Sequence, residues 1–314
     1  MKILINDGIE AIAISMLENA GIEVTNKHIP QEDLLVELPK YDAISVRSAT
    51  KVRKELIDAC PNLKLIGRGG VGLDNIDVEY ARSKGIAIVN TPAASSRSVA
   101  ELVMGHLFTI ARGLQIANRK MPLEGQTHFS DLKKSLSKGI ELETRVFGII
   151  GFGRIGQEMA KLAIGCGMKV LAYDPYVNEV TLPLVIQDEI VKIQIRTSSF
   201  DHLIANSDVI SIHTPGLEKP IINAKEIENM KNGVILLNAA RGGVIDEAAL
   251  LDGLNSGKIA GAGLDVFLNE PTPNDQLLTH PKISLSPHIG ASTIEAQNKI
   301  GVQLAEQIIE NLKK

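Results

Sequence analysis

Three polar residues in the second half of the sequence have the types that an alcohol-oxidising site requires, namely Arg241, Glu270 and His288. A histidine with a pKa of about 6.5 can take the hydroxyl proton of an alcohol when a hydride leaves the carbon. A carboxylate beside the histidine orients the ring and stabilises the imidazolium, which suits Glu270. The guanidinium of Arg241 can bind a carboxylate through two parallel hydrogen bonds and polarise the reacting oxygen. These three residues are therefore a candidate catalytic set for hydride transfer.

Each of these residues also has a plainer interpretation. A lone arginine is usually a solvated surface charge, and an acid before a proline, as at Glu270, can simply belong to a loop. His213 competes with His288, because it too follows a predicted strand. We favour His288, since an acidic loop precedes it and the start of a helix follows it. The remaining histidines lack such a setting and are expected to be surface or packing residues: His28, His106, His128, His202 and His280.

Two segments have the glycine spacing G-x-G-x-x-G, Gly67–Gly72 and Gly151–Gly156. A dinucleotide site needs a strand before this motif and a helix after it, whose free N-terminal amides meet the pyrophosphate. An acid should follow about 20 residues later to bind the ribose hydroxyls. Only the second segment meets every condition, because Asp174 lies eighteen residues after its last glycine, where the first segment has Asn90. We interpret the first segment as a tight turn after a strand.

Asp174 also indicates which dinucleotide binds. A carboxylate at this position accepts hydrogen bonds from the ribose diol and repels a 2′-phosphate. No Arg or Lys follows directly, since the next residues are Pro175 and Tyr176. We therefore expect NAD rather than NADP as the cofactor.

Short apolar runs alternate with amphipathic stretches along the chain, which is typical of parallel sheets covered by helices on both faces. Residues 1 to about 90 predict one small, doubly wound α/β domain. A long helix from about Ser98 to Arg112 should lead into a second domain, and Ser98-Val-Ala-Glu101 has the sequence of a capping box. The strands expected in the first domain are 2–5, 24–25, 43–46, 63–66 and 86–89, with helices at 9–19, 31–38, 52–59 and 78–83.

In the second domain six expected strands again alternate with helices, a pattern typical of a dinucleotide-binding sheet. The candidate catalytic residues follow three of these strands, so they should meet at the carboxyl edge of the sheet. We expect Ser292-Thr-Ile-Glu295 to cap the last helix and residues 178–197 to form a variable excursion. The expected strands are 146–150, 169–173, 209–213, 234–238, 260–266 and 282–285, with helices at 155–164, 247–255 and 294–312.

At these motifs the chain resembles the D-isomer-specific 2-hydroxyacid dehydrogenases over essentially its whole length. The resemblance implies a flavodoxin-like substrate-binding domain, residues 1–97 and 289–314, and a Rossmann NAD-binding domain, residues 98–288. It also implies that two chains pair through their NAD-binding domains, so we expect a homodimer. The segments that carry the resemblance are Val46–Val52, Gly67–Asn75 with Asn90–Pro92, Gly151–Gly156, Asn238–Glu247, Ala262–Phe267 and Pro287–Thr293.

The resemblance also implies roles for individual residues. His288 would accept the proton, Glu270 would be its partner, and Arg241 would anchor the carboxylate and carbonyl of the substrate. Val71 stands where close relatives often have Thr, which leaves only a backbone contact there. Cofactor contacts are expected from Gly151, Gly153, Arg154, Ile155, Gly156, Asp174, His213, Thr214, Pro215, Ala239, Ala240, Arg241, Asp265, His288, Gly290 and Ala291. Substrate contacts are expected from Arg47, Ser48, Arg68, Gly70, Val71, Gly72, Arg241 and His288.

The segment Val46-Arg-Ser-Ala-Thr-Lys-Val52 makes the chain most similar to family members that oxidise D-3-phosphoglycerate to 3-phosphohydroxypyruvate, the first step of L-serine biosynthesis. Arg47 and Arg68 would then bind the phosphate. The alternative is the same chemistry on glyoxylate, hydroxypyruvate or D-lactate. A less favoured alternative is an NADH-sensing binding protein, which could dispense with the catalytic residues. The sequence ends at Lys314 without the regulatory domains that many of these enzymes carry, so we expect no serine inhibition through such a domain.

The composition argues against several other classes of protein. The chain has 314 residues with a net charge of -4, and only six Phe, four Tyr and no Trp, so it offers neither a basic field nor stacking rings for nucleic acid. Its two cysteines, Cys60 and Cys166, fit neither a disulfide framework nor a zinc site, and we expect no metal. No apolar run reaches the ~20 residues of a membrane span, and the start lacks a signal peptide. We expect a cytoplasmic enzyme that acts on a small phosphorylated 2-hydroxy acid, with no nucleic-acid or membrane partner.

Overall fold

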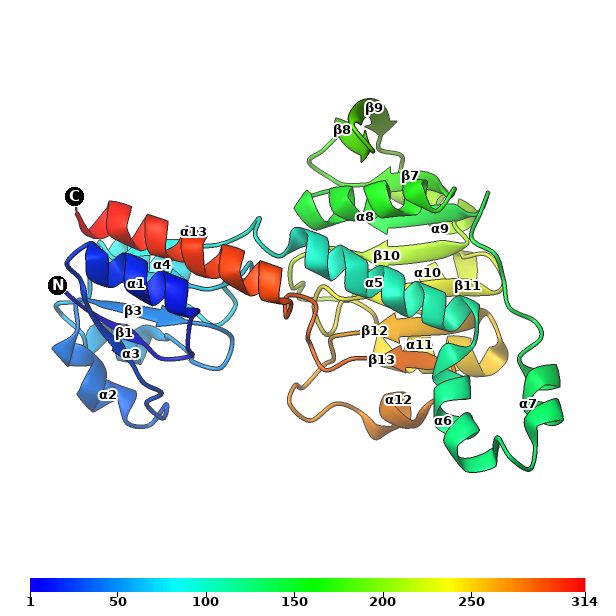
Figure 1. The fold of residues 1–314 in the computed structure, drawn as a ribbon, viewed down its shortest axis with the longest axis horizontal. Helices are drawn as coiled ribbons and strands as arrows, with labels where there is room; N and C mark the ends of the chain where they lie inside the picture. Colours follow the sequence, from blue (N-terminus) through cyan, green and yellow to red (C-terminus); the bar gives the residue numbers. More distant parts are fainter. Residues whose placement is uncertain (314) are drawn as a thin grey trace. The chain divides into compact units, whose positions relative to one another are not determined.

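The computed structural model describes residues 1–313, which form two compact units (Figure 1). Unit 1 comprises Met1–Ser98 together with the C-terminal segment from Ala291, and unit 2 comprises Val99–Gly290. Each unit is built around its own parallel sheet with helices on both faces, as expected from the alternating pattern of the sequence.

The sheet of unit 1 has five parallel strands in the order β2-β1-β3-β4-β5, which is the flavodoxin-like order. Its strands are β1 (Lys2–Ile5), β2 (Glu23–Asn26), β3 (Ala43–Val46), β4 (Leu65–Arg68) and β5 (Ala87–Asn90). Its helices are α1 (Ala11–Asn19), α2 (Leu34–Glu37) with the 3-10 turn η1 (Leu38–Lys40), α3 (Lys54–Asp58), α4 (Val78–Ser83) and α13 (Ile294–Leu312).

Alternate residues of each strand in unit 1 enter two separate cores. In β1, Ile3 and Ile5 pack on the face that α1 and α13 cover, whereas Leu4 packs on the opposite face. The C-terminal helix completes this unit, because a Cβ at Gly67 of β4 would lie only 3.3 Å from Leu304 of α13. Strands buried on both faces read as continuous apolar runs, which is why the sequence predicts them well.

The sheet of unit 2 has six parallel strands in the order β13-β12-β11-β10-β6-β7. Its strands are β6 (Val146–Ile150), β7 (Lys169–Tyr173), β10 (Val209–Ile212), β11 (Val234–Asn238), β12 (Ile259–Leu264) and β13 (Ile283–Leu285). The helices are α5 (Ser96–Ala111), α6 (Leu114–Glu124), α7 (Phe129–Ser135), α8 (Arg154–Gly165), α9 (Phe200–Asn206), α10 (Ala224–Asn229), α11 (Glu247–Ser256) and α12 (Asp275–Thr279).

The strand order of unit 2 reverses at β6, which has β7 on one side and β10 on the other. Ligands of open parallel sheets bind outside the carboxyl ends of the strands at such a switch point. The residues at these ends are Gly151, directly after β6, and His213, directly after β10. The fold therefore predicts a ligand site at the carboxyl ends of β6 and β10.

Residues 178–197, expected as a variable excursion, form an antiparallel hairpin of β8 (Glu179–Ile186) and β9 (Glu189–Arg196). Leu182 and Ile195 at its base are buried in the core of unit 2. After the hairpin, Thr197 makes a single parallel bridge to Ala172 of β7. The hairpin was not recognisable because its turn at Gln187 adopts a positive φ of 53° without the usual glycine or asparagine.

Both predicted capping boxes are shifted in the structure. Helix α5 begins at Ser96, so Ser98 lies inside the first turn, and its hydroxyl is hydrogen-bonded to Thr293 Oγ1 at 2.9 Å. Helix α13 is capped by Thr293, whose side chain accepts a hydrogen bond from the Ala296 amide, and not by Ser292. Within residues 1–313, no helix is both long and apolar enough to span a membrane.

Candidate active site

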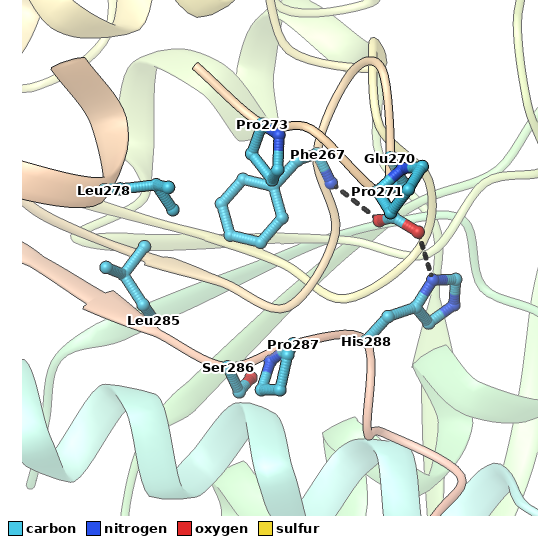
Figure 2. A pocket seen from close by; sticks show the side chains of 9 residues that line it. All are labelled: Phe267, Glu270, Pro271, Pro273, Leu278, Leu285, Ser286, Pro287 and His288. Carbon is cyan, nitrogen blue, oxygen red and sulfur yellow. Dashed lines mark hydrogen bonds and ion pairs between the residues drawn. The ribbon is translucent and has the colours of Figure 1, made fainter. Parts of the chain in front are cut away.

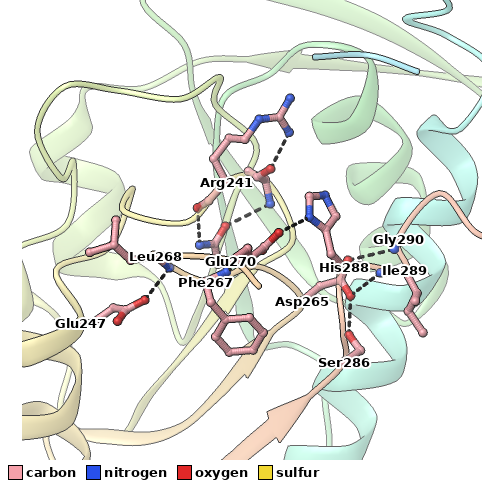
Figure 3. Close-up of polar contacts among 12 residues, drawn as sticks. Arg241, Glu247, Asp265, Phe267, Leu268, Glu270, Ser286, His288, Ile289 and Gly290 are labelled. Carbon is pink, nitrogen blue, oxygen red and sulfur yellow. Dashed lines mark hydrogen bonds and ion pairs between the residues drawn. The ribbon is translucent and has the colours of Figure 1, made fainter. Parts of the chain in front are cut away.

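The three candidate catalytic residues lie on loops that follow three neighbouring strands of unit 2 (Figure 3). Arg241 follows β11, Glu270 lies in the loop after β12, and His288 follows β13. Because these strands are parallel and adjacent, their carboxyl ends open onto the same edge of the sheet. The structure thus brings the three loops together, as the sequence predicts.

Glu270 and His288 form the central hydrogen bond of this edge. Glu270 Oε2 lies 2.8 Å from His288 Nδ1, and Glu270 Oε1 accepts a hydrogen bond from the Phe267 amide at 2.9 Å (Figure 2). A carboxylate only accepts, so Nδ1 carries the proton, and Nε2 of the neutral ring keeps its lone pair. The structure shows no hydrogen bond to this Nε2 from any residue between 1 and 313. His288 is thus oriented as a base.

The backbone at His288 is strained and is held by Asp265. His288 has a φ of 56°, a left-handed conformation that is uncommon for a residue with a side chain. Its amide donates to the Asp265 carbonyl at 2.7 Å, while the amides of Ile289 and Gly290 donate to the Asp265 carboxylate, each at 2.8 Å (Figure 3). Asp265 is only 1% exposed. Three consecutive amides therefore fix the position from which the His288 side chain extends.

The loop of Arg241 is shaped by an asparagine and a glycine. Asn238 accepts from the Ala240 amide at 3.0 Å and donates to the Arg241 carbonyl at 2.9 Å. The Arg241 guanidinium donates to the Ala240 carbonyl at 2.7 Å. A Cβ at Gly242 would lie 1.9 Å from the Phe267 carbonyl oxygen, so only glycine lets this loop approach the loop of Glu270. The sequence motif Asn238–Gly242 thus serves the close approach of the two loops.

The second glycine loop has the geometry of a pyrophosphate site. Gly151 has a φ of 92°, and a Cβ there would lie 2.6 Å from the His213 carbonyl oxygen, while a Cβ at Gly156 would lie 2.2 Å from the Gly151 carbonyl oxygen. Gly153 faces open space, and no side chain caps α8, which begins at Arg154. Two glycines permit close backbone packing, and the third leaves room beside free helix amides. These features fit a dinucleotide.

Asp174 has a second task that its spacing did not reveal. Its Oδ2 accepts a hydrogen bond from the Phe152 amide at 2.8 Å, which ties the acid to the glycine loop. Its Oδ1 accepts from the amides of Tyr176 at 2.8 Å and Val177 at 3.2 Å. A carboxylate has about four acceptor positions, so one remains for a ribose hydroxyl. Asp174 therefore holds the loop in shape and keeps acceptor capacity for a ligand.

His213, the competitor of His288, is a poor base. Its Nε2 is hydrogen-bonded to Ser211 Oγ at 2.9 Å, and burial lowers the pKa of His213 to about 4. No carboxylate is paired with this ring in the part of the chain that the structure describes. His213 Nδ1 and Thr214 Oγ1 are buried and have no partner among residues 1–313. Buried polar atoms normally have hydrogen-bond partners, so a ligand bound at the switch point could supply the partners of these two atoms. A cofactor at this position would meet that need.

A hollow of about 410 Å³ lies beside the Glu270–His288 pair (Figure 2). Apart from Glu270, Ser286 and His288, its lining is apolar: Phe267, Pro271, Pro273, Leu278, Leu285 and Pro287. Such a lining supplies no arginine or lysine, so it does not suit a phosphate. Between residues 1 and 313, no group of three or more His, Cys, Asp or Glu residues could hold a metal ion.

The residues expected to bind substrate from unit 1 lie at the carboxyl ends of β3 and β4. The Arg47 amide donates to Asp7 Oδ2 at 2.6 Å, and Asn75 Nδ2 donates to the Arg47 carbonyl at 2.7 Å. Gly70 has a φ of 145°, and a Cβ there would lie 1.5 Å from Arg68 Nη1, so the Arg68 side chain folds over this glycine. Asp7 and Asn75, which the sequence did not single out, hold the Arg47 loop. Ser48, Val71 and Gly72 lie in the same two loops.

Comparison with known proteins identifies this architecture. Residues 104–290 match the family model of the D-isomer specific 2-hydroxyacid dehydrogenase, NAD binding domain. A hydroxypyruvate reductase of Thermotoga maritima is 45% identical, covering 99% of this chain and 98% of that protein. A D-3-phosphoglycerate dehydrogenase of Archaeoglobus fulgidus is 42% identical over 100% of this chain, which spans 58% of that longer protein.

A solved structure is also similar over the whole chain. The crystal structure of a glyoxylate reductase from Paecilomyes thermophila superimposes with a TM-score of 0.84 at 30% identity, covering 100% of this chain and 96% of that one. The three relatives act on different acids by name, but they share one family, and the matched domain binds NAD. The chain therefore belongs to the D-isomer specific 2-hydroxyacid dehydrogenases, and its cofactor is NAD.

Proposed function

We propose that this chain oxidises D-3-phosphoglycerate to 3-phosphohydroxypyruvate with NAD, the first step of L-serine biosynthesis. The observation that carries the chemistry is the Glu270–His288 hydrogen bond of 2.8 Å, which leaves His288 Nε2 as a base. Arg241, on the neighbouring loop, has the guanidinium that a 2-hydroxy acid needs for its carboxylate. In this proposal unit 2 binds NAD, and residues of unit 1 contact the substrate.

The side chains have separate tasks in the oxidation. Nε2 of His288 takes the hydroxyl proton, so the oxygen becomes a carbonyl as the hydrogen on the same carbon leaves with its electron pair. The imidazolium that forms is stabilised by Glu270 through Nδ1. Arg241 binds the substrate carboxylate and polarises the reacting oxygen. In the reverse direction His288 returns the proton to the carbonyl oxygen.

The cofactor would be held by groups at the switch point of unit 2. NAD, when bound, supplies the acceptor of the hydride. The free amides at the start of α8 would bind its pyrophosphate, and Asp174 would accept hydrogen bonds from its ribose hydroxyls. Further contacts would come from residues after the later strands: His213, Thr214, Pro215, Ala239, Ala240, Asp265, Gly290 and Ala291.

The phosphate is the part of the substrate that unit 1 would recognise. Arg47 directly follows β3 and Arg68 is the last residue of the adjacent strand β4, and each carries a guanidinium suited to a phosphate. The hollow beside His288 has no such group in its lining. The 42% identity to a D-3-phosphoglycerate dehydrogenase supports the same substrate.

Hydroxypyruvate, which lacks the phosphate, is the second candidate substrate. It is favoured by the hydroxypyruvate reductase relative, because that protein matches nearly end to end at 45% identity. The chemistry at His288, Glu270 and Arg241 would be identical. Glyoxylate and D-lactate fall in the same alternative, and only the contribution of Arg47 and Arg68 separates them from a phosphorylated acid.

The test is NADH consumption with 3-phosphohydroxypyruvate beside hydroxypyruvate, glyoxylate and pyruvate, repeated with NADPH. We expect the highest kcat/KM for the phosphorylated acid with NADH. The variant His288→Gln should lose roughly 10²–10⁴-fold in kcat while it still binds NADH. A preference for an unphosphorylated acid would reject the phosphate role and keep the mechanism. Near-normal turnover by His288→Gln would reject the mechanism itself.

We also propose that the chain forms a homodimer through unit 2. Helix α6 has no buried residue and carries exposed apolar side chains, including Leu123 at 83% exposure, and Phe129 of α7 is exposed as well. Helices α6 and α7 contact each other, and exposed apolar side chains on neighbouring helices indicate a protein interface. Light scattering should give twice the chain mass, and the double variant Leu123→Glu, Phe129→Ser should lower it. A monomeric wild-type protein would reject the dimer.

A further inference from the structure

A chain of hydrogen bonds runs from helix α5 to the loop that carries His288. His106 of α5 is buried, with its Nδ1 2.8 Å from Ser284 Oγ and its Nε2 2.9 Å from Ser286 Oγ. The Ser286 hydroxyl donates to Asp265 Oδ1 at 2.6 Å. Asp265 in turn binds the amides that follow His288 (Figure 3). The sequence predicted only a surface or packing role for His106.

The directions of these hydrogen bonds follow from the chemistry of the groups. Asp265 only accepts, so the single hydroxyl proton of Ser286 is directed to it, and the Ser286 oxygen must accept from His106. His106 Nε2 therefore carries a proton. Burial lowers the pKa of His106, and the Asp265 carboxylate opposes that shift only in part, which favours a neutral ring whose Nδ1 accepts from Ser284. The ring thus sets the orientation of the Ser286 hydroxyl.

The sheet is shaped to admit this ring. A Cβ at Gly263 of β12 would lie 2.6 Å from His106 Cβ and 3.1 Å from its Cγ. Only glycine at this position lets α5 approach closely enough for both ring nitrogens to reach the serines of the β13 segment. A histidine used merely to fill space would need neither the two serines nor this close approach.

We propose that His106 is a positioning residue for His288: through Ser286 it orients the carboxylate of Asp265, which holds the strained backbone at His288. The inference rests on the proposed role of His288 as the base. The left-handed φ of 56° at His288 is uncommon, and the amides of Ile289 and Gly290 stabilise it by donating to the Asp265 carboxylate, so the orientation of His288 Nε2 depends on that carboxylate. His106 touches neither Glu270 nor His288 and acts only through this chain of bonds.

The test compares variants at each end of the chain of bonds, using the 2-oxo acid that the wild-type protein reduces fastest. His106→Leu and Ser286→Ala should each lower kcat by roughly 10- to 100-fold, because a small displacement of the base is costly. The dissociation constant for NADH should change much less than kcat, because Gly151–Gly156 and Asp174 lie outside this chain of bonds. The double variant should be no slower than the single variants, because both break the same path. His106→Gln, whose amide can still donate to Ser286, should recover most of the lost kcat.

Ser284→Ala is the matched control, since Ser284 binds the same ring but lies off the path to Asp265. It should leave kcat unchanged. Amide hydrogen exchange at Ile289 and Gly290 gives a readout that needs no substrate, and it should accelerate in His106→Leu but not in Ser284→Ala. Wild-type kcat and exchange in His106→Leu, equal damage from Ser284→Ala, or losses that multiply in the double variant would each overturn the proposal. Absence of turnover by the wild-type protein would count against the proposed function, and the exchange rates would still decide this inference.

Discussion

The two glycine-rich loops share one spacing but differ in their surroundings. Gly67–Gly72 begins inside β4 and no helix begins until Val78, whereas Gly151–Gly156 begins after β6 and contains the start of α8 at Arg154. A Cβ at Gly70 would meet the flexible side chain of Arg68, while a Cβ at Gly156 would meet a backbone carbonyl that cannot move aside. The glycines of the second loop serve close packing at a helix start, and Gly70 in the first makes room for a cation.

The two loops also differ in the residue eighteen positions after the last glycine, which is Asn90 for the first loop and Asp174 for the second. Asn90 donates Nδ2 to the Val71 carbonyl at 2.8 Å, whereas Asp174 accepts from the Phe152 amide at 2.8 Å. Both side chains hold their own loop, but Asn90 does so by donating, whereas Asp174 is an anionic group that accepts three amides and keeps about one acceptor position for a hydroxyl group. The glycine spacing is therefore not sufficient to predict a dinucleotide site, and the helix start and the carboxylate are what distinguish the second loop.

Among changes in the two loops, the most damaging should be Gly156→Ala. Its new Cβ would lie 2.2 Å from the Gly151 carbonyl oxygen, so the loop must deform and the helix amides must move away from the cofactor. We expect a loss of NADH binding of roughly 100-fold or more, measured by fluorescence titration, and a destabilisation of about 1–3 kcal/mol. Gly69→Ala in the first loop is the control, because its Cβ would only touch Ile300 at 3.4 Å. Equal NADH affinities of the two variants would contradict the proposal that only the second loop binds the dinucleotide.

Arg68→Ala tests whether the first loop serves a phosphate. Loss of a charge-assisted contact should raise KM for 3-phosphohydroxypyruvate by roughly 10- to 100-fold and leave KM for hydroxypyruvate nearly unchanged. Gly70→Ala should reproduce part of this effect, since its Cβ would displace Arg68 Nη1. A similar rise in KM for both acids would show that Arg68 does not recognise the phosphate.

Asp174→Ala removes the acceptor from the second loop. NADH should bind roughly 10- to 100-fold more weakly, because the ribose contact and the hydrogen bond to the Phe152 amide are lost together. NADPH should gain little, since the loop is no longer held in shape. The comparison is Asn90→Ala, at the equivalent position after the first loop, which should leave NADH affinity unaltered. Tight NADPH binding by Asp174→Ala would show that the carboxylate acts by repulsion alone.

The buried ring of His213, which directly follows β10, should also give the protein a pH-dependent stability. The pKa of His213 is about 4 in the folded chain against 6.5 for an ordinary histidine, so below pH 6.5 the unfolded state binds a proton that the folded state does not. Stability is therefore lost as the pH falls from 6.5 towards 4, by about 2 kcal/mol between pH 7 and pH 5. Urea denaturation should show a smaller loss for His213→Gln. If the free energy of unfolding fell equally with pH in both proteins, groups other than His213 would cause the loss.

The parts that the sequence predicted well are those with a periodic or local signal. The buried strands are continuous apolar runs in the sequence, and Gly151–Gly156 differs from Gly67–Gly72 in the predicted strand before it, the helix after it and the acid at Asp174. The polar chain from His106 to Asp265 joins residues 180 positions apart, such as His106 and Ser286, and no local pattern marks such contacts. The hairpin after Val177 was missed for a related reason, because its turn lacks the residues that usually signal one.

The three amide bonds to Asp174 have a consequence for changing the cofactor. A change of cofactor from NAD to NADP would begin, on our proposal, with removal of the Asp174 carboxylate, which is expected to repel the extra phosphate. In this chain the same carboxylate fastens the glycine loop to the segment after β7, so its removal also loosens the platform on which any dinucleotide rests. A change of cofactor specificity would first need another acceptor for these three amides, introduced before Asp174 is replaced. The residue proposed to select the cofactor also stabilises the loop, so we expect any single substitution of Asp174 to weaken the binding of NAD with little gain in the binding of NADP.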